Sequence, residues 1–311
     1  MPMRFKRKVI LFKNEGTAGQ DAAPVAATNA ILVRNFRMSF LDQEGDDRDF
    51  DVTYVGNKGR LLSGATVKFD FDVEMAGSGA AGTAPGYGPL LKACAMSETV
   101  NAGVSVVYAP VNPGSETTGT LYFYLDGRLH KAVYCLGNVT PKLSRGKAPL
   151  YAFSFIGIYV APTDVALVSP TLSAFQKPLV VNNANTTPVT VHGFAGKFSE
   201  IQFSSGNVLT YRNLVGSESV RFTDRDSRGS VKLEDELVAT KDWWTIMRAG
   251  TLGAMSVTHG TVAGNKVVLA APNVQLLDPG SDAEDNIAML SMNMLLTATL
   301  AGNDEFSITV Q

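Results

Sequence analysis

The chain has 311 residues, of which 45% are hydrophobic and 18% are charged. That length suits about two domains, with cores that need neither metals nor disulfides. The net charge of −2 comes from 27 basic and 29 acidic residues, so there is no basic excess to hold nucleic acid by its phosphates. This argues against a protein that grips DNA tightly, but it is compatible with one that lets DNA slide past. The low charge also leaves surface for copies of the chain to bury, although burial inside one large domain would look the same.

The two cysteines, Cys94 and Cys135, are too few for a disulfide framework or a cysteine zinc site, and we expect both to be reduced and buried. The N-terminus is basic, but only four apolar residues, Val9 to Phe12, precede Lys13. A secretory signal needs an apolar run of about 7–15 residues, and a membrane span needs about 18. The sequence therefore predicts a soluble protein made in a cytoplasm, with no membrane partner.

Strand patterns dominate the chain. Residues 67–74 alternate apolar and charged side chains, which predicts a strand with one dry and one wet face. Residues 121–125, the turn pair Asp126-Gly127 and the apolar run 132–136 predict a β-hairpin. Residues 151–160 predict another long strand, with aromatic side chains on one face.

Helical signals are few. The segment PLLKACAM, which starts at Pro89, and the segment KDWWTIMRA, which starts at Lys241, each predict a short helix packed on a sheet, the second with Asp242 as its N-cap. Trp243 and Trp244 are expected to be core or interface anchors rather than stacking platforms for bases, because no basic cluster surrounds them.

Two stretches lack a clear period. Residues 161–192 carry four prolines and several asparagines and threonines, which indicates a linker with an extended strand in 188–192. Residues 41–66 are rich in charge and glycine and predict a long irregular loop. The predicted division is a first domain with an N-terminal arm at 1–162, a linker at 163–190 and a second domain at 191–311.

The two halves carry similar segments in the same order, which predicts a duplicated β domain. Two unrelated β domains with shared patterning are the alternative. The matches are 67–73 with 231–237 (an offset of 164), 90–94 with 246–250 (156) and 108–110 with 270–272 (162), and the halves close in predicted strands at 151–160 and 306–310.

The run FDFDVEMAGSGAAGTAPGYGPLLKACAMSETV (69–100) resembles the first domain of the tail tube (major tail) proteins of long-tailed, siphovirus-like bacteriophages. In those proteins a long strand leads into a Gly/Ala-rich loop and a short helix with a Leu-Leu-Lys/Arg-Ala motif. Residues 211–244 and 248–279 extend the similarity, which covers the chain from about residue 5 to its end.

The resemblance implies an all-β fold with short flanking helices, built from tandem tail-tube-type β-sandwich or barrel domains that join a continuous inner β-barrel on assembly. Copies would close into rings that stack into a tube for DNA. Most family members have one such domain and form hexameric rings, and those with two form trimers with pseudo-sixfold symmetry. The repeat favours the trimer.

The resemblance also implies partners and a location. The partners would be copies of the chain itself, tape-measure, tail terminator and baseplate proteins, and double-stranded DNA in transient, non-specific passage. The location would be the virion tail, assembled in the host cytoplasm.

The wet faces of the predicted strands 67–74 and 231–237 supply a hypothesis for the lumen. An acidic wall repels DNA, so the polymer would not stick during passage. The alternative is the solvated outer face of an ordinary strand. The candidate lumen-facing residues are Asp70, Asp72, Glu74, Glu234 and Glu236.

Stacked rings need a second interface. The loop 41–66 and the N-terminal arm carry charges of opposite sign, which would suit a contact between successive rings. A solvated loop and a frayed terminus are the alternative. The candidates are Arg4, Lys6, Arg7, Lys8, Asp46, Asp47, Arg48, Asp49 and Asp51.

No enzyme, metal or cofactor is expected. His130, His192 and His259 are not at ligand spacing, and the Gly-rich stretch 77–88 holds neither a phosphate loop nor a nucleophile elbow. The acidic residues at 224–226 and 234–236 lack the further ligands of a calcium loop. The rival functions are another tail-fold protein (a terminator, a baseplate hub or a secretion-system tube) and a two-domain β-sandwich module that binds carbohydrate.

Overall fold

The computed structural model describes residues 3–311 and is mostly β, with 54% of residues in strands and 4% in helices. This confirms the all-β class. In chain order the elements are β1 (Lys8–Asn14), β2 (Ala30–Ile31), β3 (Arg34–Asp47), β4 (Arg60–Glu74), α1 (Gly88–Ala93), β5 (Met96–Asn101), β6 (Ser105–Pro110), β7 (Gly119–Leu125), β8 (Arg128–Ser144), β9 (Leu150–Asp164), β10 (Thr186–Val191), β11 (Phe198–Ser204), β12 (Asn207–Leu214), β13 (Ser217–Arg225), β14 (Arg228–Glu234), α2 (Trp243–Arg248), β15 (Leu252–His259), β16 (Val267–Glu284), β17 (Ile287–Leu296) and β18 (Ser307–Val310).

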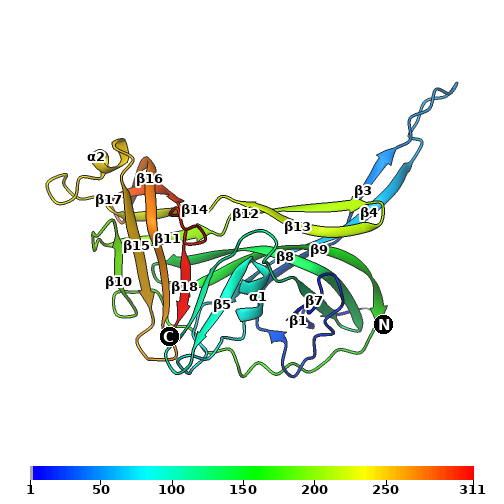
Figure 1. Cartoon of the computed structure of the whole chain (residues 1–311), viewed down its shortest axis with the longest axis horizontal. Coiled ribbons are helices and arrows are strands. Elements are labelled where there is room, and N and C mark those ends of the chain that lie inside the picture. Colours follow the sequence, from blue (N-terminus) through cyan, green and yellow to red (C-terminus); the bar gives the residue numbers. More distant parts are fainter. Residues whose placement is uncertain (1–2) are drawn as a thin grey trace.

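The two halves of the chain repeat one antiparallel strand order. In the first half the order is β1-β7-β8-β9-β4-β3, and in the second it is β10-β15-β16-β17-β14-β11. Figure 1 shows the two groups as separate lobes, with α1 beside the first and α2 beside the second. By this topology β14 is the equivalent of β4, β16 of β8 and β17 of β9.

The strand order revises the sequence repeat. The matches of 67–73 with 231–237 and of 90–94 with 246–250 join equivalent elements, β4 with β14 and α1 with α2. The other two do not, because 108–110 lies in β6 and 306–310 leads into β18, which pair with each other. Short β segments align easily by composition, and only the ladder identifies the equivalent strands.

The halves join edge to edge through β8 and β11. Residues Glu200, Ile201 and Gln202 of β11 lie opposite Ser144, Leu143 and Lys142 of β8. One large sheet therefore continues past the irregular segment between β9 and β10, while the predicted domain division at 163–190 stays a prediction. The strand predicted in 188–192 is confirmed as β10.

Alternation explains how the core forms. The apolar side chains of β4 from Val67 to Val73 point inward and are buried, and Phe69 and Phe71 pack on Phe155 and Phe153 of β9 with ring centroids 5.3 and 5.6 Å apart. The strand predicted at 67–74 is thereby confirmed. The other local predictions that are confirmed are the turn at Asp126-Gly127, with φ positive at both residues, the two helices with Asp242 capping α2, and the buried, unpaired Cys94 and Cys135.

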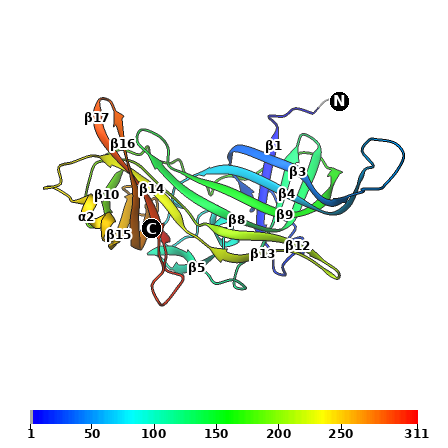
Figure 2. The same cartoon turned by 90° about the horizontal axis from the view of Figure 1, so that it is seen from above.

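The stretch 41–66 is not the irregular loop that its composition predicts. Strands β3 and β4 run through most of it as a long hairpin, and only residues 48–59 form a connecting loop. We call residues 40–66 the arm, which projects from the body in Figures 1 and 2. Register shifts between Ser39 and Asp42 and between Glu44 and Gly45 interrupt the ladder, and such bulges erase the alternation that marks a strand.

Candidate assembly surfaces

One face of the sheet is polar, and it runs without a break across the joint between the halves. Cross-strand partners carry their side chains on the same face. A row of such partners runs from Glu74 on β4 through Leu150, Lys142 and Gln202 to Ser230 on β14. This polar face also bears Asp70, Asp72 and Glu234, so four of the five candidate lumen residues lie on one surface.

The polar face is a lattice of mixed charge rather than an acidic one. Its carboxylates have close polar neighbours: Glu74 lies 3.0 Å from Arg34, Asp72 accepts from Asn35 at 2.8 Å, and Glu234 lies 2.6 Å from Lys197. Two of its lysines are paired too, Lys68 with Asp42 at 2.5 Å and Lys232 with Asp282 at 2.6 Å. Exposed pairs of this kind contribute about 0–1 kcal/mol each to stability, so their main effect is on the charge that the surface presents.

The fifth candidate, Glu236, is not on this strand. Strand β14 ends at Glu234, and the predicted strand 231–237 is therefore too long. The N–H of Asp235 donates to Ala288, after which the chain leaves the ladder on its way to α2. The acidic run 234–236 therefore extends beyond the residues of β14 that pair with β17.

A hairpin that the sequence did not reveal covers part of the polar face. Strands β12 and β13 form a separate two-stranded sheet, and we call residues 207–225 the covered hairpin. Its Val220 and Phe222 are buried against Leu136 of β8, with Ile156 and Ile158 of β9 alongside. Figure 1 shows the covered hairpin stretching from the second lobe across the first. The open part of the polar face therefore starts at the row of Asp70 and Ser154.

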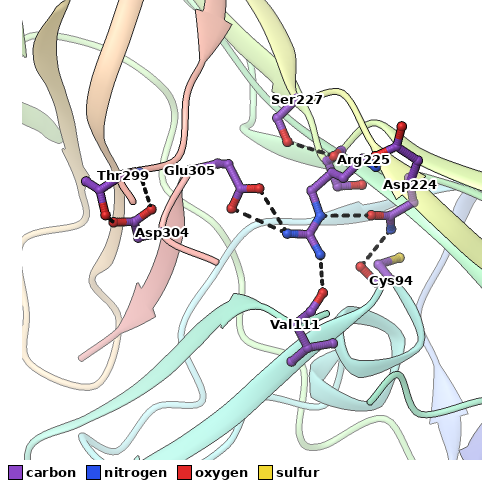
Figure 3. A network of polar contacts seen from close by, with 10 residues as sticks. Cys94, Val111, Asp224, Arg225, Ser227, Thr299, Asp304 and Glu305 are labelled. Atoms are coloured by element: carbon purple, nitrogen blue, oxygen red, sulfur yellow. Dashed lines mark hydrogen bonds and ion pairs between the residues drawn. The ribbon is translucent and has the colours of Figure 1, made fainter. Parts of the chain in front are cut away.

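A buried polar network holds the covered hairpin at its base (Figure 3). The Arg225 guanidinium lies 3.2 Å from a Glu305 carboxylate oxygen. It also donates to the carbonyl of Val111 and, at 3.4 Å, to the side-chain oxygen of Asn207. The Asn207 amide donates in turn to Cys94 O at 2.8 Å and to a second backbone carbonyl. Burial lowers the pKa of the Arg225 guanidinium, and the Glu305 carboxylate opposes that shift. This network fastens the second half to the end of α1 in the first.

The structure does not bring the two candidate ring-stacking sets together. In the N-terminal set, Arg4 and Arg7 bind Asp126 at the β7–β8 turn, and Lys8 lies over the ring of Phe5. In the arm, Asp46 and Asp47 end β3, and Arg48, Asp49 and Asp51 lie in the tip loop. Figure 1 shows the N-terminal segment before β1 well apart from the tip of the arm.

Comparison with models of known protein families finds no match, and comparison with curated proteins finds none either. Within residues 3–311, no group of three or more His, Cys, Asp or Glu side chains is placed to hold a metal ion. Neither of the helices in that part of the chain has the length and apolar character needed to cross a membrane.

Proposed function

We propose that this chain is a structural subunit of a phage tail tube, which assembles itself into stacked rings around a channel for DNA during genome ejection. The observation that supports this most is the β8–β11 joint. One chain already holds two segments with the same strand order, joined edge to edge. A chain that repeats such a segment can extend the same sheet through further copies until a ring closes, and tandem tube domains would close it with about three chains.

The polar face supports a channel wall of a particular kind. Lys68, Lys232 and Arg34 each face a carboxylate, so these three cations are not free to hold phosphate. A wall of paired charges offers DNA neither a strong repulsion nor a grip. The non-sticking surface would then come from neutralisation within the wall rather than from an acidic lining.

The stacking contacts belong to the same proposal. The tip of the arm and the N-terminal segment lie apart in Figure 1, which suits contacts with different rings, and the ends of the tube would meet the tape-measure, terminator and baseplate proteins. Deleting residues 1–8 should shorten or abolish tubes. Full-length tubes from that variant would remove the N-terminal segment from the stacking interface.

Negative-stain electron microscopy of the purified protein over a range of concentrations tests the assembly itself. Rings or tubes are the expected result. A persistent monomer that binds a glycan would overturn the proposal in favour of a carbohydrate-binding module. An atomic structure of the tube would test the lumen, because Asp70, Asp72 and Glu74 should point into the channel.

A further inference from the structure

Within residues 3–311, two sheet edges and one hairpin lack the partners that their equivalents have. We infer that copies of this chain join as its two halves do: β3 of one copy pairs with the end of β16 in the next, and the arm lies over Leu277 and Leu295 of that neighbour. The inference rests on the proposed self-assembly and specifies which surfaces and which register carry it.

The equivalence of the halves has an internal anchor. Strand β4 ends at Glu74 opposite Leu150, and the next N–H, of Met75, donates to Pro149. Strand β14 ends in the same way, at Glu234 opposite Met289, and the N–H of Asp235 donates to Ala288. The two glutamates are therefore equivalent positions, and further equivalent residues follow by counting cross-strand pairs from them.

Counting residues along the ladders shows which residues of β3 and β16 correspond to the paired residues of β11 and β8. Gln202 faces Ser230 on β14, as Arg37 faces Asp70 on β4, so Arg37 is the equivalent of Gln202. Lys142 faces Leu150 on β9, as Asp282 faces Met289 on β17. In the chain Gln202 lies opposite Lys142, and between copies Arg37 would lie opposite Asp282. Phe36 would then face Ala283, as Ile201 faces Leu143.

Both strands have the free edge that this joint requires. Among residues 3–311, β3 pairs only with β4, whereas its equivalent β11 has β14 on one side and β8 on the other. Strand β16 pairs with β15 only as far as Gln275, so on that side its end, residues 276–284, is open. The corresponding side of β8 is the one that β11 occupies. Unpaired edges of this length expose backbone groups that a further strand would satisfy.

The charges on the two edges are complementary. Arg37 is exposed and has no ion pair within residues 3–311, and Arg34 lies beside it on β3. The end of β16 is acidic: Asp282 pairs within the chain with Lys232 at 2.6 Å, and Glu284 and the following Asp285 both pair with Arg145. Arg37 of the next copy would therefore add a second cation beside Asp282. Opposite charges on facing positions fix register and disfavour slipped alignments.

The arm and its target repeat the apolar contact under the covered hairpin. Leu61 and Leu62, which point to opposite faces of the arm, are 59% and 58% exposed, whereas alternate residues of the equivalent strand β13, Val220 and Phe222, are buried. Ile156 in the first half corresponds to Leu295 in the second, and Asn138 corresponds to Leu277. Leu277 and Leu295 are half-buried, and Leu252, in the same cross-strand row as Leu295, is 50% exposed. Only a neighbouring copy presents an arm to cover them.

Disulfide trapping between differently labelled chains tests the register. An Arg37→Cys chain is mixed with an Asp282→Cys chain under conditions in which the wild type forms rings, and both native cysteines remain buried. Facing positions have Cβ atoms about 4.5–5.5 Å apart, close to disulfide geometry. We expect at least about tenfold more covalent heterodimer than from Arg37→Cys with Ala283→Cys, because a one-residue slip places the thiols on opposite faces.

The in-chain joint supplies the matched control. A Gln202→Cys/Lys142→Cys chain should form the same bond within one molecule, which shows that the position tolerates a disulfide. Rings that form without the 37–282 bond, while the control bond forms, would overturn this inference and leave the proposed function standing. Protein that never forms rings would overturn both. Rings with the bond at 37–282 and not at 37–283 would establish the joint.

Discussion

The arm and the covered hairpin are equivalent elements in opposite circumstances. Each extends the edge strand of its half-sheet and the strand next to it, which are β3 and β4 for the arm and β11 and β14 for the covered hairpin. In the covered hairpin Val220 and Phe222 are 0% and 4% exposed, because the other half of the chain lies beneath them. In the arm Leu61 and Leu62 stand in solvent. The apolar side chains of one hairpin are thus covered within the chain, and those of its equivalent are exposed. A repeat whose next unit lies in another copy would leave its last hairpin uncovered in this way.

The largest expected effect is at the fastening of the covered hairpin, for which the arm shows no counterpart. Replacing Arg225 with Met should lower the free energy of unfolding by about 3–5 kcal/mol, because it leaves the Glu305 carboxylate, whose side chain is 16% exposed, without its partner and removes the hydrogen bonds of Arg225 to Val111 and Asn207. Urea unfolding at concentrations where the protein is monomeric measures this. Asp49→Asn, which breaks the long ion pair of a fully exposed carboxylate with Lys58 in the arm, should change the value by less than about 0.5 kcal/mol.

The double variant Arg225→Met/Glu305→Leu separates pairing from burial. If the loss in the single variant comes from the unpaired carboxylate, the double variant should recover most of it. A double variant as unstable as the single one would mean that the hydrogen bonds from Arg225 to Asn207 and Val111 hold the hairpin instead.

The comparison of the two hairpins also shows what the sequence could predict. Strand β4, the turn at Asp126-Gly127 and the cap at Asp242 follow from local patterns, and all were predictable. Neither hairpin was, because bulges break the alternation in the arm and in β12–β13 alike. The Arg225–Glu305 pair joins residues 80 apart, and no local signal marks such partners.

The candidate site divides in the same way. Alternation placed Asp70, Asp72 and Glu74 on one face of a strand, and the structure agrees. It did not show that Arg34 and Asn35 would lie against two of those carboxylates, because they belong to a strand that the sequence did not predict. The face that looked acidic along one strand is mixed across several.

Truncating the buried face of the covered hairpin should have the next largest effect. Phe222→Ala should cost about 3–4 kcal/mol of unfolding free energy, since the ring fills a closed contact with Leu136 and its neighbours. Leu62→Ala, at the bare position in the arm, should cost under about 0.5 kcal/mol in the monomer. Equal losses in the two variants, measured by urea unfolding, would mean that the arm is packed within its own chain.

Placing charged residues in the arm should have a small effect on unfolding but a large effect on assembly. Leu61→Asp/Leu62→Asp should leave monomer unfolding nearly unchanged and weaken ring formation by at least about tenfold. The two side chains point to opposite faces of the arm, and the leucine that faces the neighbour contributes about 1.5–3 kcal/mol to the interface. Sedimentation velocity across a concentration series measures the shift. Leu300→Asp, at a fully exposed leucine in the loop after β17, is the matched surface control and should assemble normally. Normal assembly of the arm variant would remove the arm from the joint.

The smallest effect should come from the far end of the covered hairpin, where it meets the base of the arm. Burial, followed by the hydrogen bond to Glu218, raises the pKa of Tyr211 to about 12, and the neighbouring Asn213 donates to Ser63 in the arm. An unfolded chain ionises tyrosine near pH 10, so the folded state holds this proton longer. The stability contributed by the Tyr211 hydroxyl should be fully present below about pH 10 and be lost as the pH rises from there towards 12. Urea midpoints of the wild type should therefore fall more steeply than those of Tyr211→Phe above about pH 10, and parallel curves would show that the hydroxyl is solvated like that of an ordinary surface tyrosine.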